Sequence, residues 1–178
     1  MKTPTAEQPG QDGLYEQASA DFGAALGRLA RSYEIDADKQ RDLLQDIHLA
    51  LWRSFAGFEG TCSVRTWVYR VAHNVAASHV LRQRRHRRGG LVSLDDIEDP
   101  LEDADAASDV DRSEVLSRLY ALIHRLRPLD RQLILLYLEG CDAASIGEIT
   151  GMTPGSVATR VHRIKRILAD RYQKGSIR

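Results

Sequence analysis

Apolar side chains recur at steps of three and four residues along most of this chain. That spacing places them on one face of an α-helix. In the first half it predicts helices at 14–33, 38–55 and 66–88. In the second half it predicts helices from 114 to just before 128, at 129–139, at 143–150 and from 154 to about 172. The pattern therefore predicts an all-α fold.

The last two helices are bounded by residues with strong positional preferences. Asp142 and Thr153 suit the N-cap position, and Pro154 occupies the first turn, where proline is best tolerated. Gly151 ends the shorter helix. A short helix, a glycine-containing turn of three or four residues, and a longer basic helix together describe a helix-turn-helix.

The helix at 66–88 joins an apolar face to a dense basic end. Its predicted core side carries Val64, Trp67, Val68, Val71, Ala72, Val75 and His79. Its predicted outer side carries Tyr69, Arg70, His73, Asn74 and Ala77. Five arginines and one histidine crowd into 82–88, and their mutual repulsion favours a polyanionic partner such as nucleic acid. The alternative is a core helix followed by a solvated charge run.

Charge is segregated along the chain, although the totals balance at 25 basic and 25 acidic residues. Residues 1–90 hold 13 basic and 10 acidic residues, residues 91–113 hold one and nine, and residues 114–178 hold 11 and six. The acidic segment has few groups able to form a core, so we expect it to be extended and self-repelling. We therefore expect a disordered tail at 1–13, a small helical domain at 14–90, a flexible acidic linker at 91–113 and a small helix-turn-helix domain at 114–178.

Enzyme chemistry finds no support in the sequence. The six histidines show no metal-ligand spacing with cysteine or with one another beyond what helices produce by chance, and a zinc site through Cys62 and His73 is not favoured. The chain contains no GxxxxGK[ST], GxGxxG or GxSxG string. We expect no catalytic residues, no metal and no cofactor.

Cysteine usage and hydropathy bear on the compartment. Cys62 and Cys141 lie far apart in sequence, which favours a reducing compartment over a disulfide framework. No apolar run approaches the roughly 18 to 20 residues needed to span a bilayer, and residues 1–13 have no apolar signal core. These features predict a cytoplasmic protein without membrane insertion.

The helix at 38–55 carries aspartates at four-residue intervals, at Asp38, Asp42 and Asp46. Like charges at this spacing destabilise an isolated helix slightly. The ordinary interpretation is a solvated acidic face. The sharper one is a docking surface for a basic partner, with Leu49 and Trp52 as apolar anchors.

The last helix has two contrasting sides. Its predicted core stripe consists of Val157, Val161, Ile164 and Leu168. The opposite side carries Ser156, Thr159, Arg160, Arg163 and Arg166. A helix that reads DNA needs side chains near its N-terminus that reach base edges, together with cations that hold phosphates. This side has both, and the alternative is an amphipathic helix whose basic face has no DNA partner.

Several strings of the chain match one family pattern. The first half contains DLLQD at 42–46, FEG at 58–60 and SVRTWVYRVAHN at 63–74. The second half contains a leucine-rich helix ending in EG at 139–140, then Gly151 and GSVATRVHRI at 155–164. Over roughly residues 14–172 the chain resembles the extracytoplasmic-function (group four) sigma factors of bacterial RNA polymerase, and residues 65–74 are the most specific part of that match.

The resemblance implies a transcription initiation factor with three interaction surfaces. The surface implied to face the clamp helices of core RNA polymerase comprises Asp42, Gln45, Asp46, Leu49 and Trp52. The surface implied to open and hold the promoter element nearest the start site comprises Phe58, Arg65, Thr66, Trp67, Arg70, Asn74, Ser78, Arg82, Arg84 and Arg85. The surface implied to read the upstream promoter element in duplex DNA comprises Ser156, Thr159, Arg160, Arg163 and Arg166. The resemblance also implies an anti-sigma partner and an acidic linker that threads the polymerase near the RNA exit path.

The chain departs from the family pattern at four positions. Ser78 stands where relatives often carry Asp or Asn, and Leu81 lies near the start of the basic run. Ser145 and Gly147 stand where Glu and Ala are usual. These departures concern promoter preference and local helix stability.

Two other readings of the sequence remain open at this point. A stand-alone helix-turn-helix transcriptional regulator would explain the second half, with the first half sensing a ligand or forming a dimer. The second alternative is a helical adaptor or inhibitor-binding protein that makes no DNA contact.

Overall fold

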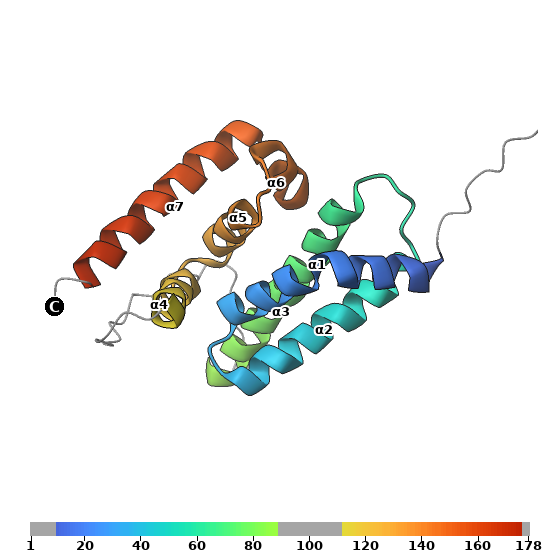
Figure 1. Ribbon diagram of the computed structural model, residues 1–178, viewed down its shortest axis with the longest axis horizontal. Coiled ribbons are helices and arrows are strands. Elements are labelled where there is room, and N and C mark those ends of the chain that lie inside the picture. Colours follow the sequence, from blue (N-terminus) through green and yellow to red (C-terminus); the bar gives the residue numbers. More distant parts are fainter. Residues whose placement is uncertain (1–9, 89–111, 176–178) are drawn as a thin grey trace, which may run out of the picture.

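The structure is a computed structural model that describes residues 10–88 and 112–175. Within these residues all regular elements are helices, as the sequence predicts: α1 (Gln11–Tyr33), α2 (Ala37–Phe55), α3 (Val64–Arg88), α4 (Arg112–His124), α5 (Pro128–Leu138), α6 (Ala143–Thr150) and α7 (Pro154–Gly175). Helices α1–α3 form one group and α4–α7 another, with α7 at the outer edge of the second (Figure 1). The groups meet where α1 and α3 pack against α4, α5 and α6. Most of the predicted linker and the first nine residues of the predicted tail lie outside the described residues.

Helix α1 begins three residues earlier than predicted, because tertiary contacts hold its first turn on α2. The side-chain amide of Gln11 donates to the carbonyl oxygen of Trp52 at 2.8 Å. The indole nitrogen of Trp52 in turn donates to Asp12 Oδ1 at 2.8 Å. Residues 11–13, which the sequence assigned to a disordered tail, are therefore helical. Helix α4 likewise begins at Arg112, inside the predicted linker.

The core of the first group lies where the three helices face one another. On α2 the buried stripe is Leu43, Ile47, Leu51 and Phe55. The neighbouring Leu44 is only partly buried. Asp38, Asp42 and Asp46 are all exposed, so the acidic side of α2 faces away from this core.

Helix α3 differs from its prediction more strongly, since Tyr69 and His73 were placed on the outer side and are 3% and 2% exposed. The second group of helices and α1 cover that side of α3. The hydroxyl of Tyr33 lies 3.2 Å from His73 Nδ1, and the guanidinium of Arg131 from the second group lies 4.9 Å from the centre of the Tyr33 ring. The predicted core residues Trp67, Val71 and Val75 are partly buried.

Burial of His73 makes the stability of the fold depend on pH. Desolvation by burial lowers the pKa of His73 to about 3, from 6.5. At this position the folded chain therefore binds fewer protons than the unfolded chain between about pH 3 and pH 6.5. The free energy of unfolding is consequently at its full value above pH 6.5 and decreases as the pH falls below 6.5. At ~1.4 kcal/mol per pH unit, we expect a loss of about 2 kcal/mol in unfolding free energy between pH 6.5 and 5.

Denaturant unfolding of His73→Gln at the two pH values measures this contribution. The variant should lose most of the 2 kcal/mol difference, since no proton is taken up at this position on unfolding. The matched control is His162→Gln, because His162 is exposed on α7. An undiminished pH dependence in His73→Gln would contradict this interpretation of the buried imidazole.

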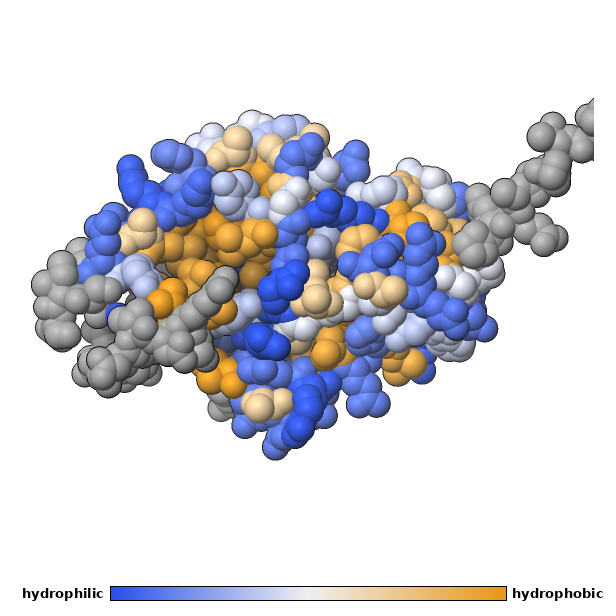
Figure 2. Space-filling view, in the orientation of Figure 1, coloured by the Kyte–Doolittle hydropathy of each residue, from blue (hydrophilic) through white to orange (hydrophobic). Residues whose placement is uncertain are grey.

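The second group has its own core, built around α5. Leu133, Ile134 and Leu136 are almost fully buried, together with Ile123 of α4 and Ile146 of α6. The predicted stripe of α7 is confirmed, since Val157, Val161, Ile164 and Leu168 are all buried. Apolar side chains also reach the surface between α7 and the α4–α5 pair (Figure 2).

The turn between α6 and α7 is tightly built. The backbone N–H of Ser145 donates to Asp142 Oδ1 at 2.8 Å, and Gly151 ends α6 with a left-handed φ of 77°. A β-carbon at Gly147 would lie 2.6 Å from the carbonyl oxygen of Met152. That distance excludes alanine unless the turn shifts, which explains the glycine at this position. The close approach between α6 and the turn that follows it therefore depends on glycine at position 147.

Candidate protein and nucleic-acid interfaces

The predicted docking residues of α2 form one continuous exposed surface. Positions 42, 45, 46, 49 and 52 recur at three- and four-residue steps, so they share one side of the helix. Leu49 is 44% exposed and Trp52 is 40% exposed, which is unusual for large apolar side chains beside carboxylates. The surface therefore offers negative charge around two apolar anchors.

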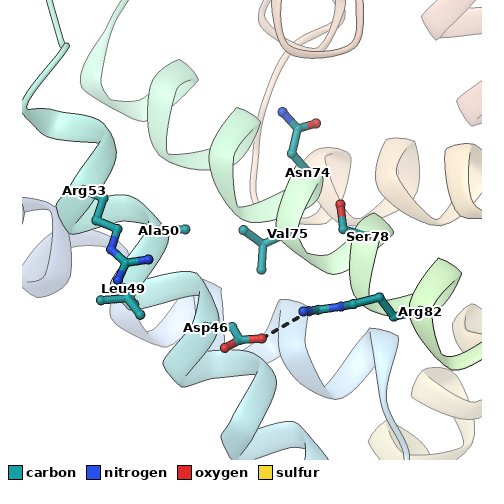
Figure 3. Close-up of a pocket in the computed structure, with 8 residues that line it drawn as sticks. All are labelled: Asp46, Leu49, Ala50, Arg53, Asn74, Val75, Ser78 and Arg82. Carbon is teal, nitrogen blue, oxygen red and sulfur yellow. Dashed lines mark hydrogen bonds and ion pairs between the residues drawn. The ribbon is translucent and has the colours of Figure 1, made fainter.

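An open groove of about 410 Å³ lies between α2 and α3. Figure 3 shows Asp46 from α2 and Arg82 from α3 pointing toward each other across it, with 3.2 Å between Asp46 Oδ2 and Arg82 Nη2. The groove is lined by Asp46, Leu49, Ala50, Arg53, Asn74, Val75, Ser78 and Arg82. It thus brings residues of the predicted polymerase-binding set next to residues of the predicted promoter-binding set.

The start of α3 is fixed both to α2 and to the loop that follows α2, in which Phe58 lies. The rings of Phe58 and Trp67 lie 5.4 Å apart between centroids, and both side chains are partly buried. The indole nitrogen of Trp67 donates to Ser54 Oγ at 2.9 Å. The backbone N–H of Thr66 donates to Ser63 Oγ at 3.1 Å, which caps the helix. These contacts orient the first turns of α3, where three further predicted promoter-binding residues lie.

Those three residues, Arg65, Thr66 and Arg70, contact the second group of helices. Arg70 Nη2 donates to the carbonyl oxygen of Glu148 at 2.8 Å. Thr66 is 4% exposed, and its hydroxyl lies 3.4 Å from Glu148 Oε2. Arg65 donates to the carbonyl oxygen of Glu139.

A bidentate ion pair closes the same junction. Arg28 of α1 binds both carboxylate oxygens of Glu139, each at 2.7 Å. The hydrogen bond to Glu139 raises the pKa of Arg28. We call the contacts of Arg28, Arg65, Thr66 and Arg70 with Glu139 and Glu148 the interdomain clasp. Neither glutamate is predicted from the sequence to be functional, because no local pattern marks two residues whose partners lie far away in the chain.

The groove side of α3 stays accessible beyond the clasp. Asn74 and Ser78 are exposed, and Arg82 and Arg85 extend the exposed polar surface toward the end of the helix. Within residues 10–88 and 112–175 the amide of Asn74 has no hydrogen-bond partner. The side chain of Arg84 lies outside the described part of the chain.

The predicted DNA-reading residues lie together along the outer side of α7. Ser156, Thr159, Arg163 and Arg166 are exposed, whereas Arg160 is partly buried. Arg160 Nε donates to Asp130 Oδ1 on α5 at 2.5 Å. The sequence does not predict a functional role for Asp130, because its partner Arg160 lies 30 positions away in the chain.

The described residues contain neither a candidate metal site nor a candidate membrane span. No group of three His, Cys, Asp or Glu side chains in 10–88 and 112–175 is placed to hold a metal ion. None of the helices in the same ranges is both long enough and apolar enough to cross a membrane.

Two family models match the chain. Sigma-70 region 2 matches residues 21–86, which cover most of α1, all of α2 and most of α3. Sigma-70 region 4 matches residues 116–168, from α4 into α7. The matches therefore coincide with the two groups of helices.

Two related sigma factors match over about two thirds or more of the chain. The chain is 32% identical over 123 residues to the RNA polymerase sigma factor CarQ of Myxococcus xanthus, covering 68% of each. It is 28% identical over 139 residues to the ECF RNA polymerase sigma-E factor of Haemophilus influenzae, covering 74% of each.

Two solved structures share the fold. One is CnrH in complex with the cytosolic domain of CnrY, with TM-score 0.64, 21% identity and coverage of 90% of this chain and 88% of that chain. The other is the sigma factor RpoE of Bartonella quintana in complex with the anti-sigma factor NepR, with TM-score 0.64, 22% identity and coverage of 88% and 94%.

Proposed function

Because the chain belongs to the extracytoplasmic-function sigma factors of bacterial RNA polymerase, it binds core polymerase and directs promoter recognition, and we propose how its surfaces divide that work. In this proposal residues 14–90 dock on polymerase and bind the promoter element nearest the start site. Residues 114–178 take the upstream element, with 91–113 as the tether. A stand-alone helix-turn-helix regulator is not favoured, because it leaves region 2 without a role.

The exposed side of α2 docks on core polymerase. The observation that supports this assignment is the pairing of exposed carboxylates with the half-exposed anchors Leu49 and Trp52. Apolar anchors inside a charged rim are typical of protein interfaces. The partner is a basic helical surface, namely the clamp helices of the largest subunit.

The groove side of α3 holds one separated promoter strand. Asn74 and Ser78 offer polar groups without competing partners in the described residues, and Arg82 supplies a cation beside them. Amide and guanidinium groups can hold an extruded base, while further cations follow the backbone. Arg85 and the rest of the basic run attract phosphates without reading sequence.

The outer side of α7 reads the upstream element as duplex DNA. Arg163 and Arg166 are exposed cations, and Ser156 and Thr159 lie in the first two turns, where a recognition helix meets base edges. The solved relatives were captured with CnrY and with NepR, and we propose an anti-sigma partner for this chain as well.

Co-purification with core polymerase tests the proposed division most simply. The folded chain should elute with core from size-exclusion chromatography, and residues 14–90 are proposed to supply most of the affinity. A folded chain that elutes apart from core at micromolar concentration would overturn the docking assignment.

The interdomain clasp has to open before Arg65, Thr66 and Arg70 can touch promoter DNA, because all three are engaged by Glu139 or Glu148. Glu139→Arg sets a cation against Arg28 and should shift the free chain roughly tenfold toward separated halves. Small-angle scattering should then report a larger radius of gyration. The exchanged pair Arg28→Glu with Glu139→Arg should restore the smaller value, and an unchanged radius in the single variant would count against the clasp.

A further inference from the structure

A nearly buried carboxylate holds two arginines of the proposed DNA-reading surface. Asp130 lies in the first turn of α5 and is 8% exposed. Its Oδ1 accepts from Arg160 Nε at 2.5 Å, and its Oδ2 lies 3.8 Å from Arg163 Nη2. The side chains of Arg160 and Arg163 are 31% and 56% exposed, so both reach from the carboxylate toward solvent.

A purely structural role for Asp130 is the first alternative. A carboxylate in the first turn suits the positive end of the helix dipole, and the ion pair ties α5 to α7. Those helices are already joined by buried apolar side chains, among them Leu133, Val157 and Ile164. Such packing needs no charged pair, and burying one is seldom the most stabilising solution.

The geometry of Arg160 favours a second role. Among the described residues Arg160 makes its hydrogen bond through Nε, which leaves both Nη groups available. A guanidinium edge with two donors is the group that recognises guanine in the major groove. Fixing one edge on Asp130 sets the plane in which the other edge faces outward.

We propose that Asp130 is a positioning residue that orients Arg160 and Arg163 for the upstream promoter element and thereby sets the selectivity of α7 for DNA sequence. The inference rests on the proposed DNA-reading role of α7. An arginine held before binding loses less rotamer freedom when it meets a base edge. This gain in affinity applies only to a DNA sequence whose base edges fit the orientation in which Asp130 holds the arginines.

The same carboxylate should weaken non-specific binding to DNA, which is the opposite of its effect on specific binding. Its negative charge partly offsets the two arginines and so weakens their attraction for phosphates. Removing Asp130 should therefore lower binding to the preferred duplex while leaving binding to unrelated duplexes equal or stronger. A loss of folding would lower both, so the ratio separates the two roles.

The test uses the full chain assembled with core polymerase. Wild-type holoenzyme first enriches duplexes from a random-sequence pool, and the enriched duplex is compared with a scrambled version of itself. The selectivity ratio is the dissociation constant for the scrambled duplex divided by that for the enriched duplex. We expect Asp130→Ala to reduce this ratio by about tenfold, while the scrambled duplex is bound no more weakly than by wild type. Asp130→Asn, which keeps an acceptor for Arg160 and the shape of the site, should give a smaller loss in the same direction. The matched control is Asp170→Ala, which removes the same charge from an exposed position on α7.

Arg160→Ala and Arg163→Ala complete the experiment. If either reduces the ratio but both Asp130 variants leave it unchanged, the positioning role is wrong and the role of α7 stands. If Asp130 variants weaken both duplexes equally, Asp130 is structural only. If neither arginine variant changes the ratio, the assignment of α7 fails and the positioning role fails with it.

Discussion

Reversing the charges of Asp42 and Asp46 together is expected to weaken binding to core RNA polymerase by about 100-fold or more. Both side chains are exposed on α2 beside Leu49 and Trp52. A cation placed inside a charge-complementary interface meets like charge and also removes the attraction that the carboxylate supplied. The double variant Asp42→Arg with Asp46→Arg, titrated against labelled core polymerase, measures the effect.

The fold should tolerate this change. The ion pair that Asp46 makes with Arg82 joins side chains that are 49% and 59% exposed, and pairs of that kind contribute about 0–1 kcal/mol. Arg82→Ala removes the pair without reversing charge and should keep core binding near the wild-type value. Asp21→Arg is the matched control on α1, because Asp21 is exposed and lies outside the docking surface. Wild-type affinity in the double variant would remove the docking assignment.

Replacing Arg70 and Asn74 with alanine is expected to reduce formation of the open promoter complex by about 100-fold. Each base that is stacked or clamped contributes roughly 1–3 kcal/mol, so removing two such interactions with DNA accounts for the size of the effect. Core binding should stay unchanged, because neither residue lies on the exposed side of α2. Permanganate reactivity of unpaired thymines reports the opening directly.

A control variant and a stability measurement separate promoter opening from effects on folding. Gln17→Ala with Arg31→Ala removes one polar and one cationic side chain from exposed positions of α1 and serves as the control. Thermal unfolding should remain close to wild type in both double variants, since Arg70 loses one hydrogen bond to a carbonyl oxygen. Normal permanganate reactivity in the Arg70 and Asn74 variant would place the separated strand elsewhere.

Most of the features of the fold that the sequence predicts correctly depend on local helical spacing. The stripe of α7 and the caps at Asp142 and Gly151 depend on residues a few positions apart, and the structure has them as expected. The environment of His73 depends instead on Tyr33 and on a helix from the other half of the chain. Nothing within one turn of His73 indicates that a second layer will cover it.

The candidate surfaces divide in the same way. The exposed side of α2 and the outer side of α7 follow from helical spacing, so the sequence predicted which residues share each side. The contact between Arg28 and Glu139 joins residues 111 positions apart, and the contact between Asp130 and Arg160 joins residues 30 apart. Such pairs become visible only when packing brings their helices together. The resemblance supplied roles for α2, α3 and α7 but none for these partners.

Transcription in a purified system shows whether this chain directs promoter recognition by core polymerase. Core polymerase, the chain and a library of genomic fragments from the source bacterium are combined, and the 5′ ends of the transcripts are mapped. We expect discrete start sites that appear with the chain and are absent with core alone. These sites should disappear when Asp42 and Asp46 are both replaced with arginine. A folded chain that leaves the pattern of core-only transcripts unchanged across the library would contradict its role as a sigma factor.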